Sequence, residues 1–120
     1  MENQIQPQPY WADFKIKVGL YAKQEENGET KRVLIDPKDI QFKFTYKDAK
    51  DNQLIASYDG TTRVNHKIED NHIIVIVNSN TFQCRILRVT RAFNTPDSDF
   101  NDGIWDYGDK TVYTNIEIVS

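Results

Sequence analysis

Hydrophobic and polar residues alternate along several short stretches of the chain. The clearest stretch is residues 40–46, where Ile40, Phe42, Phe44 and Tyr46 alternate with polar side chains. A period of two places the apolar side chains on one face and predicts a half-buried strand. Similar alternation, or a short apolar run, predicts further strands at residues 14–20, 32–35, 54–58, 62–68, 72–77, 83–93 and 112–118.

The predicted core follows from the apolar face of these strands. Residues 73–77 form an unbroken apolar run, which is typical of a central strand covered on both faces. No window of a dozen residues has a convincing helical period, so we expect no long helix. The side chains expected inside are Phe14, Ile16, Val18, Ile40, Phe42, Phe44, Val75, Ile116 and Ile118.

Polar segments separate the predicted strands. Residues 23–31 are interpreted as a charged loop around Asn27-Gly28, and residues 94–111 as a long irregular segment. Residues 1–11 are rich in Gln and Pro and have too little apolar surface to fold onto their own domain. We therefore expect an N-terminal extended arm, flexible alone and ordered by a partner, followed by a domain over residues 12–120. A frayed terminus is the competing interpretation of the arm.

Composition agrees with a β fold. The chain has 120 residues, enough for one domain, with 13 Ile, 8 Val and 9 Thr against 4 Leu, 5 Ala and 1 Met. Side chains branched at Cβ fit the pleated surface of a sheet. The sequence thus predicts an all-β protein, a single two-sheet β-sandwich of seven to eight strands. A small closed barrel is the alternative architecture.

Charge and cysteine usage exclude several classes of protein. The net charge of −3 provides no positive field for phosphates, so we expect no nucleic-acid partner. No run of about 18 apolar residues is present, and we expect no membrane contact. The single cysteine, Cys84, cannot form an internal disulfide, and the first residues do not resemble a secretory signal. Both features predict synthesis in a reducing cytoplasm.

The sequence provides no catalytic set. Cys84 has no base placed near it by any motif, and His66 falls on the apolar face of its predicted strand, as a packed, hydrogen-bonded residue would. The acidic segment 97–103 resembles a calcium loop, but its glycine is one position late and its closing position is Gly108 rather than glutamate. We therefore predict that the protein is not an enzyme and needs no metal or cofactor.

Aromatic and basic residues are the candidates for an interface. Tyr10 and Trp11 end the arm, and Trp105 and Tyr107 lie in the irregular segment. Such side chains can anchor a protein interface or stack on a sugar, although Trp105 and Tyr107 could also cover the end of the sandwich. In the strand 83–93, Arg88 is expected to face away from Arg85 and Arg91, toward solvent or an acidic partner.

A family resemblance is based on the order of several short motifs. They are Asp13-Phe14-Lys15-Ile16, Ile40-Gln41-Phe42-Lys43-Phe44-Thr45, Ala56-Ser57-Tyr58-Asp59-Gly60, Val64-Asn65-His66-Lys67-Ile68-Glu69-Asp70, Asn78-Ser79-Asn80-Thr81-Phe82-Gln83-Cys84-Arg85-Ile86-Leu87, Phe100-Asn101-Asp102-Gly103 and Thr114-Asn115-Ile116-Glu117-Ile118. Over residues 12–119 the chain resembles immunoglobulin-like β-sandwich modules in virion proteins of Bacteroides-infecting tailed phages, including crAss-like phages. It also resembles the N-terminal domain of phage baseplate upper proteins. Cys84 stands where such modules often carry a glycine.

The resemblance implies a structural role in a virion assembled in the host cytoplasm. The protein is expected to be an auxiliary capsid or head-fibre component that binds other virion proteins, namely capsid or tail subunits. One version of this hypothesis also includes a homo-oligomer. Two alternatives stay open at this point. One is a baseplate or tail-fibre module, and the other is a carbohydrate-binding sandwich that uses Trp105 and Tyr107 to bind a host glycan.

Overall fold

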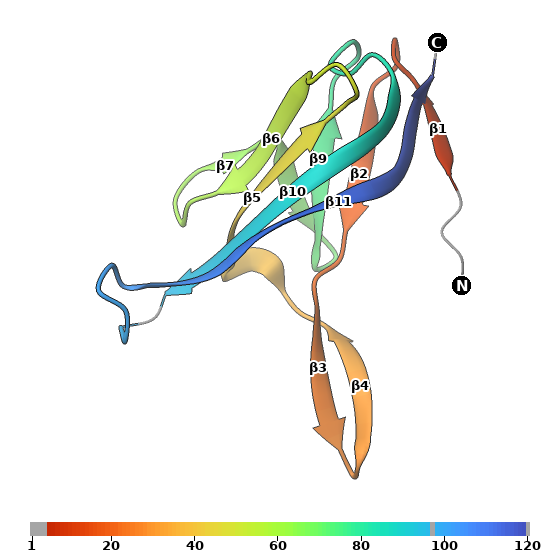
Figure 1. Cartoon of the computed structure of the whole chain (residues 1–120). Helices are drawn as coiled ribbons and strands as arrows, with labels where there is room; N and C mark the ends of the chain where they lie inside the picture. Colours follow the sequence, from red (N-terminus) through yellow and green to blue (C-terminus); the bar gives the residue numbers. More distant parts are fainter. Residues whose placement is uncertain (1–4, 97, 120) are drawn as a thin grey trace.

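The computed structural model describes residues 5–96 and 98–119, and this part of the chain is all-β (Figure 1). It contains eleven strands and one short 3₁₀ helix, Pro37–Asp39. The strands are β1 (Gln6–Pro9), β2 (Phe14–Val18), β3 (Tyr21–Glu26), β4 (Glu29–Leu34), β5 (Gln41–Lys47), β6 (Gln53–Tyr58), β7 (Arg63–Val64), β8 (His66–Glu69), β9 (His72–Val77), β10 (Arg85–Pro96) and β11 (Ile104–Val119). The prediction of an all-β protein is confirmed.

The strands form two main sheets and a separate hairpin. The large sheet has the order β1-β11-β10-β5-β6-β7, and the small sheet has the order β2-β9-β8. Strands β3 and β4 pair only with each other among the described residues. Buried side chains from both sheets meet in one core, which also includes Phe82 from the segment before β10.

The core agrees closely with the alternation in the sequence. Phe42 and Phe44 of β5 are 3% and 1% exposed, and their rings lie 4.6 Å apart. Six of the nine predicted core residues are buried, namely Ile16, Phe42, Phe44, Val75, Ile116 and Ile118. The other three, Phe14, Val18 and Ile40, are partly buried. Phe14 and Val18 are the end residues of β2, and Ile40 caps the 3₁₀ helix just before β5 begins.

The apolar run in β9 is covered less evenly than predicted. Ile73, Val75 and Val77 face the core and are almost fully buried. On the outer face, Ile74 is 8% exposed but Ile76 is 36% exposed. The expectation of a strand covered on both faces is therefore wrong at Ile76, because no further layer of the described chain lies over that end of β9.

Two segments interpreted as loops are β-ribbons. Residues 23–31 belong to the hairpin β3–β4, whose turn has φ 53° at Asn27 and φ 79° at Gly28, as a two-residue hairpin turn requires. Residues 94–111 mostly continue β10 and β11, which pair as far as Pro96 and Ile104. The prediction for residues 23–31 failed because these residues are all exposed, so no apolar alternation marks them.

The described part of the N-terminal arm is attached to the large sheet. Strand β1 pairs in parallel with the end of β11, from Gln6 opposite Ile116 to Pro9 opposite Val119. The chain then crosses to the small sheet, where β2 pairs antiparallel with β9. The expectation that residues 6–9 would not fold onto their own domain is wrong, because backbone hydrogen bonds hold them without apolar side chains.

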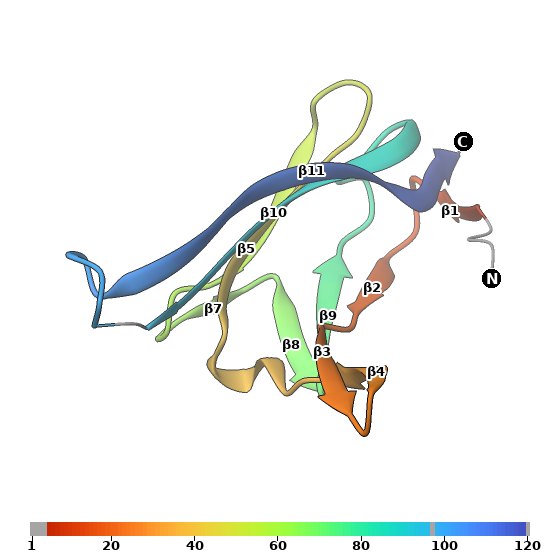
Figure 2. The same ribbon diagram turned by 60° about the horizontal axis from the view of Figure 1, so that its bottom comes forward.

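The molecule is extended for its length. Its radius of gyration is 15.9 Å, and its principal extents are 47 × 36 × 24 Å. A compact domain of this size would have a radius of gyration of about 14 Å. Figures 1 and 2 show the cause: the hairpin β3–β4 and the outer half of the β10–β11 ribbon both project away from the two sheets.

Candidate functional site

The projecting hairpin β3–β4 contributes little to the core of the domain. Residues 23–32 are all exposed, and Tyr21 at its base is 50% exposed. The contacts that stabilise the hairpin are local: the Arg32 guanidinium lies 4.6 Å from the centre of the Tyr21 ring, and Lys31 Nζ lies 3.6 Å from Glu26 Oε2. An isolated two-stranded hairpin is marginally stable in water. The hairpin would therefore gain stability from a partner surface.

The tip of the hairpin is acidic. It carries Glu25, Glu26 and Glu29 within five residues. Glu26 and Glu29 are direct cross-strand partners on either side of the turn. Like charges placed directly opposite each other destabilise a strand pair. Lys31 offsets part of this repulsion through its contact with Glu26. A cationic partner at the tip would relieve the rest.

The outer face of the small sheet has the opposite character. Ile74 in β9 lies between Lys17 of β2 and Lys67 of β8 in the pairing register, and Ile76 lies beside Lys15. We call these five residues the lysine–isoleucine face. Aliphatic lysine stems can cover neighbouring apolar side chains while their charged ends stay in water. This arrangement accounts for the low exposure of Ile74 on an outer face.

The lysines of this face also act on the carboxylate of Glu69. Its carboxylate accepts a hydrogen bond from Lys67, with Nζ 2.7 Å from Oε2. That bond and the positive charge of Lys67, with smaller contributions from Lys15 and Lys17, lower the pKa of Glu69 below its usual value. The positive field of the lysines therefore extends across the face.

The arm residues predicted for an interface lie near the C-terminus. Tyr10 and Trp11 are 42% and 57% exposed, and their rings meet edge to face with centroids 5.6 Å apart. The Tyr10 backbone N–H donates to the Val119 carbonyl over 2.9 Å, and its own carbonyl accepts from Asn80 N–H over 2.7 Å. The pair is thus anchored by its backbone and presents its rings to solvent.

The two loop aromatics are on a different part of the molecule. The backbone of Trp105 pairs with Thr95 in the β10–β11 ribbon. The side chains of Trp105 and Tyr107 lie outside the described residues, so the predictions made for them stay predictions. Figure 1 places this ribbon tip far from β1, so the arm and loop aromatics do not form one site.

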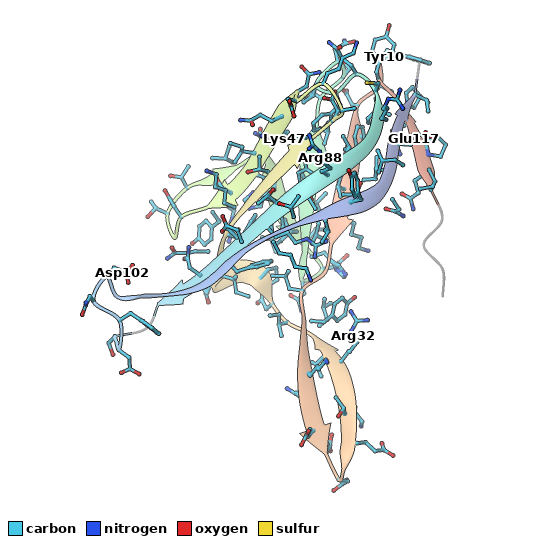
Figure 3. The ribbon with its side chains drawn as sticks, viewed as in Figure 1. Tyr10, Arg32, Lys47, Arg88, Asp102 and Glu117 are labelled. Atoms are coloured by element: carbon cyan, nitrogen blue, oxygen red, sulfur yellow. The ribbon has the colours of Figure 1, made fainter. Side chains whose placement is uncertain are left out.

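Arg88, the remaining candidate, is engaged within its own chain. Its Nη2 lies 2.9 Å from Asp51 Oδ1 and donates to the Asp48 carbonyl over 3.2 Å. Figure 3 shows it on the broad outer face of the large sheet. It borders a shallow hollow of about 490 Å³ whose other lining residues include Arg85, Tyr113 and Glu117.

The predicted orientation of the three arginines is wrong in one respect. Arg85 and Arg88 line the same hollow, although their spacing of three predicts opposite faces. The register of β10 shifts between Ile86 and Arg88, and Arg85 has φ 69°. Such an irregularity breaks the alternation of side chains. Arg91 instead lies near Tyr46, where burial raises the pKa of the phenol to about 12 and Arg91 opposes the shift.

Asp48 is a buried carboxylate that the sequence analysis did not single out. Its Oδ1 accepts from the backbone N–H groups of Lys50 and Asn52, each over 2.9 Å. Its Oδ2 accepts from Asn52 Nδ2 over 2.9 Å and from Gln83 N–H over 2.7 Å. Burial opposes the charged form, but these hydrogen bonds outweigh it and hold the pKa of Asp48 below its usual value. Its role is structural, since it ties the β5–β6 turn to the segment before β10.

His66 is packed and hydrogen-bonded, as predicted. It is 8% exposed, and its ring lies 4.8 Å from that of Phe42. Nδ1 lies 2.9 Å from the Val64 carbonyl and Nε2 lies 3.1 Å from Arg63 Nη1, so the proton belongs on Nδ1 and Nε2 accepts. Burial lowers the pKa of His66, the hydrogen bond to Val64 opposes this shift, and the Arg63 charge adds to it.

Potential metal ligands do not cluster in the described ranges of the chain. Residues 5–96 and 98–119 contain no group of three His, Cys, Asp or Glu residues that could hold a metal ion. In the acidic segment, Asp97 lies outside the described residues, and Gly103 N–H donates to the Phe100 carbonyl over 2.9 Å to close the ribbon tip. No helix in the described chain is long and apolar enough to cross a membrane.

Comparison with known proteins gives no relative. No protein-family model matches the chain, no curated protein matches it, and no solved structure matches its fold.

Proposed function

We propose that the chain is a structural module of a tailed-phage virion, an auxiliary capsid or head-fibre component that binds neighbouring subunits. The observation that carries the proposal is the exposed hairpin β3–β4, which projects from the sheets with little support from its own domain (Figure 2). Ordering each residue of such a segment costs about 1–2 kcal/mol of backbone entropy. Subunits of an assembly repay this cost through contacts that the free subunit lacks.

We also propose that the fold is an immunoglobulin-like sandwich. The order β2-β9-β8 corresponds to strands B, E and D of variable-type domains, and β11-β10-β5-β6-β7 corresponds to G, F, C, C′ and C″. In this correspondence, the hairpin β3–β4 is inserted between B and C, and the β10–β11 tip is the F–G connection. Those connections lie at one end of such a sandwich, which supports a binding role for that end.

The first test is the location of the protein. Particles purified on a density gradient from infected cells should contain the chain at a fixed copy number by quantitative mass spectrometry. A protein abundant in the lysate but absent from the particles would contradict the proposal.

A hairpin variant tests the proposed contact. Residues 22–33 would be replaced by a short Gly-Ser linker, with Lys43→Ala as a control at an exposed position of the large sheet. The linker variant should keep the melting temperature of the wild type, since the hairpin packs little on the sheets, but should be depleted from particles. If the linker variant occupies particles as fully as the wild type, the hairpin does not form the assembly contact.

Glycan binding is the second candidate function, and one observation favours it. Tyr113 is 75% exposed beside the hollow lined by Arg85, Arg88 and Glu117. An exposed ring beside charged hydrogen-bonding groups can stack on a sugar. Binding on a glycan array that Tyr113→Ala abolishes would support this candidate, and an array without any bound glycan would reject it.

A further inference from the structure

We propose that the acidic tip of hairpin β3–β4 docks on the lysine–isoleucine face of a second copy of this chain. This inference rests on the proposed role of the hairpin in assembly and names its partner. The two surfaces lie at different places on one molecule, so the contact pairs the tip of one copy with the face of another.

Charge complementarity selects the second copy as the partner. The tip carries three carboxylates, Glu25, Glu26 and Glu29, with Lys31 as the nearest cation in the hairpin. The face carries Lys15, Lys17 and Lys67, all exposed, and because Lys67 is paired with Glu69, its positive charge comes mainly from Lys15 and Lys17. Docking would place cations beside the opposed pair Glu26–Glu29 and carboxylates beside the row of lysines. Complementary charges of this kind set the register and specificity of an interface.

The face also offers apolar area of a suitable length. Ile76 is 36% exposed, and Ile74 lies beneath the flanking lysines, so a docked ribbon would cover both. The six-residue strands of the hairpin span about 20 Å, and the five-residue β2 spans about 17 Å at 3.3 Å per residue. A ribbon of this length matches the six-residue central strand β9 and extends about 3 Å beyond β2.

The hairpin of one copy cannot use its own face. It begins three residues after β2 and continues away from the small sheet, as Figures 1 and 2 show. Its tip therefore points away from Lys15 and Lys17 of the same chain. Because tip and face are different surfaces, two copies that exchange tips form a closed two-fold dimer, whereas a one-way contact generates rings or open filaments.

Charge reversal in the full chain tests the inference. The tip variant is Glu26→Lys with Glu29→Lys, and the face variant is Lys15→Glu with Lys17→Glu. Sedimentation velocity at low salt should show concentration-dependent self-association of the wild type, which weakens at high salt because salt screens exposed charges. Each variant alone should self-associate at least about tenfold more weakly, since like charges would then meet.

Recombination provides the decisive result. A mixture of the two variants should associate, because the unchanged acidic tip of the face variant meets the unchanged lysines of the tip variant. A chain with all four reversals should also self-associate. The control Lys43→Glu with Lys110→Glu changes two exposed lysines of the large sheet by the same total charge and should associate like the wild type.

Several outcomes would overturn the inference. They are a monomeric wild type at all concentrations, association unaffected by either reversal at an unchanged melting temperature, or a mixture of the two variants that does not recombine. A chain present in particles but monomeric in solution would refute self-docking and leave the virion role standing. Self-association of a chain absent from particles would refute the virion role and leave self-docking standing.

Discussion

Each carboxylate oxygen of Asp48 accepts two hydrogen bonds, so the side chain accepts four in all. The substitution Asp48→Asn therefore tests how much these bonds contribute to stability. An asparagine amide keeps one acceptor oxygen and replaces the other with an NH2 group. In either orientation the NH2 would face two donors: the backbone N–H groups of Lys50 and Asn52, or Asn52 Nδ2 and Gln83 N–H. The side chain of Asp48 is fully buried, so these donors cannot turn to water without moving the turn.

The expected loss is large for a change of one atom. Hydrogen bonds to a charged group contribute about 1.5–3 kcal/mol each, and two are lost. We therefore expect Asp48→Asn to lower the free energy of unfolding by about 3–6 kcal/mol, a large part of the roughly 5–15 kcal/mol typical of a domain. Urea denaturation followed by tryptophan fluorescence measures this change.

Asp59→Asn is the matched control. Asp59 accepts from Thr61 N–H over 2.9 Å and from Thr62 N–H over 2.8 Å, both through Oδ1. An amide oxygen can take over both bonds at this exposed turn, so the control should be close to the wild type. A loss of unfolding free energy below about 1 kcal/mol in Asp48→Asn would refute the conclusion that all four hydrogen bonds to the Asp48 carboxylate stabilise the fold.

Acid should reduce the difference between the wild type and Asp48→Asn. The pKa of Asp48 lies below its usual 3.8 in the folded chain, so the unfolded chain takes up this proton first. The stabilisation from the carboxylate is complete above the unfolded pKa and is lost as the pH falls through the folded pKa. Urea titrations between pH 7 and pH 2.5 should show the two proteins converging only below about pH 4.

Three further predictions follow from the core, the buried histidine and the first strand. Phe44→Ala should cost about 3–5 kcal/mol in urea denaturation, as truncation of a buried phenylalanine does, and a loss below about 1 kcal/mol would contradict its placement. Because the pKa of His66 in the folded chain is lowered from 6.5, the unfolded chain takes up the proton first, and stability should fall as the pH drops below that value. The melting temperature of His66→Gln should fall less over the same pH range. An equal fall in melting temperature for both proteins would contradict this prediction. Deleting residues 1–9 removes β1 from the edge of β11 and should lower the melting temperature by several degrees, whereas an unchanged value would show that this pairing contributes little.

The sequence alone determined the fold class and most of the core. Alternation over residues 40–46 fixed both the strand and its buried face, because side chains of a strand point to opposite sides in turn. The same reasoning placed Ile16, Val75, Ile116 and Ile118 inside. These predictions depend on local geometry and burial, which leave a periodic trace in the chain.

Elements that bury little surface left no such trace. Hairpin β3–β4 was interpreted as a loop because its residues are charged, although Asn27-Gly28 had already marked its turn. Strand β1 is predicted as an unattached arm because it is held by backbone pairing with residues more than a hundred positions away. Long-range backbone pairing depends on the assembled sheet, not on the side chains of the segment itself.

The candidate sites were decided almost entirely by the tertiary structure. The polar turn at residues 47–53 was predictable, but only the packing of residues 82–84 beside it buries Asp48 and adds Gln83 N–H to its partners. Lysines and isoleucines from β2, β8 and β9 share one face because three segments far apart in sequence pair in a single sheet. Periodicity determines which way a side chain points within its strand, and only the pairing of strands determines which other side chains it meets.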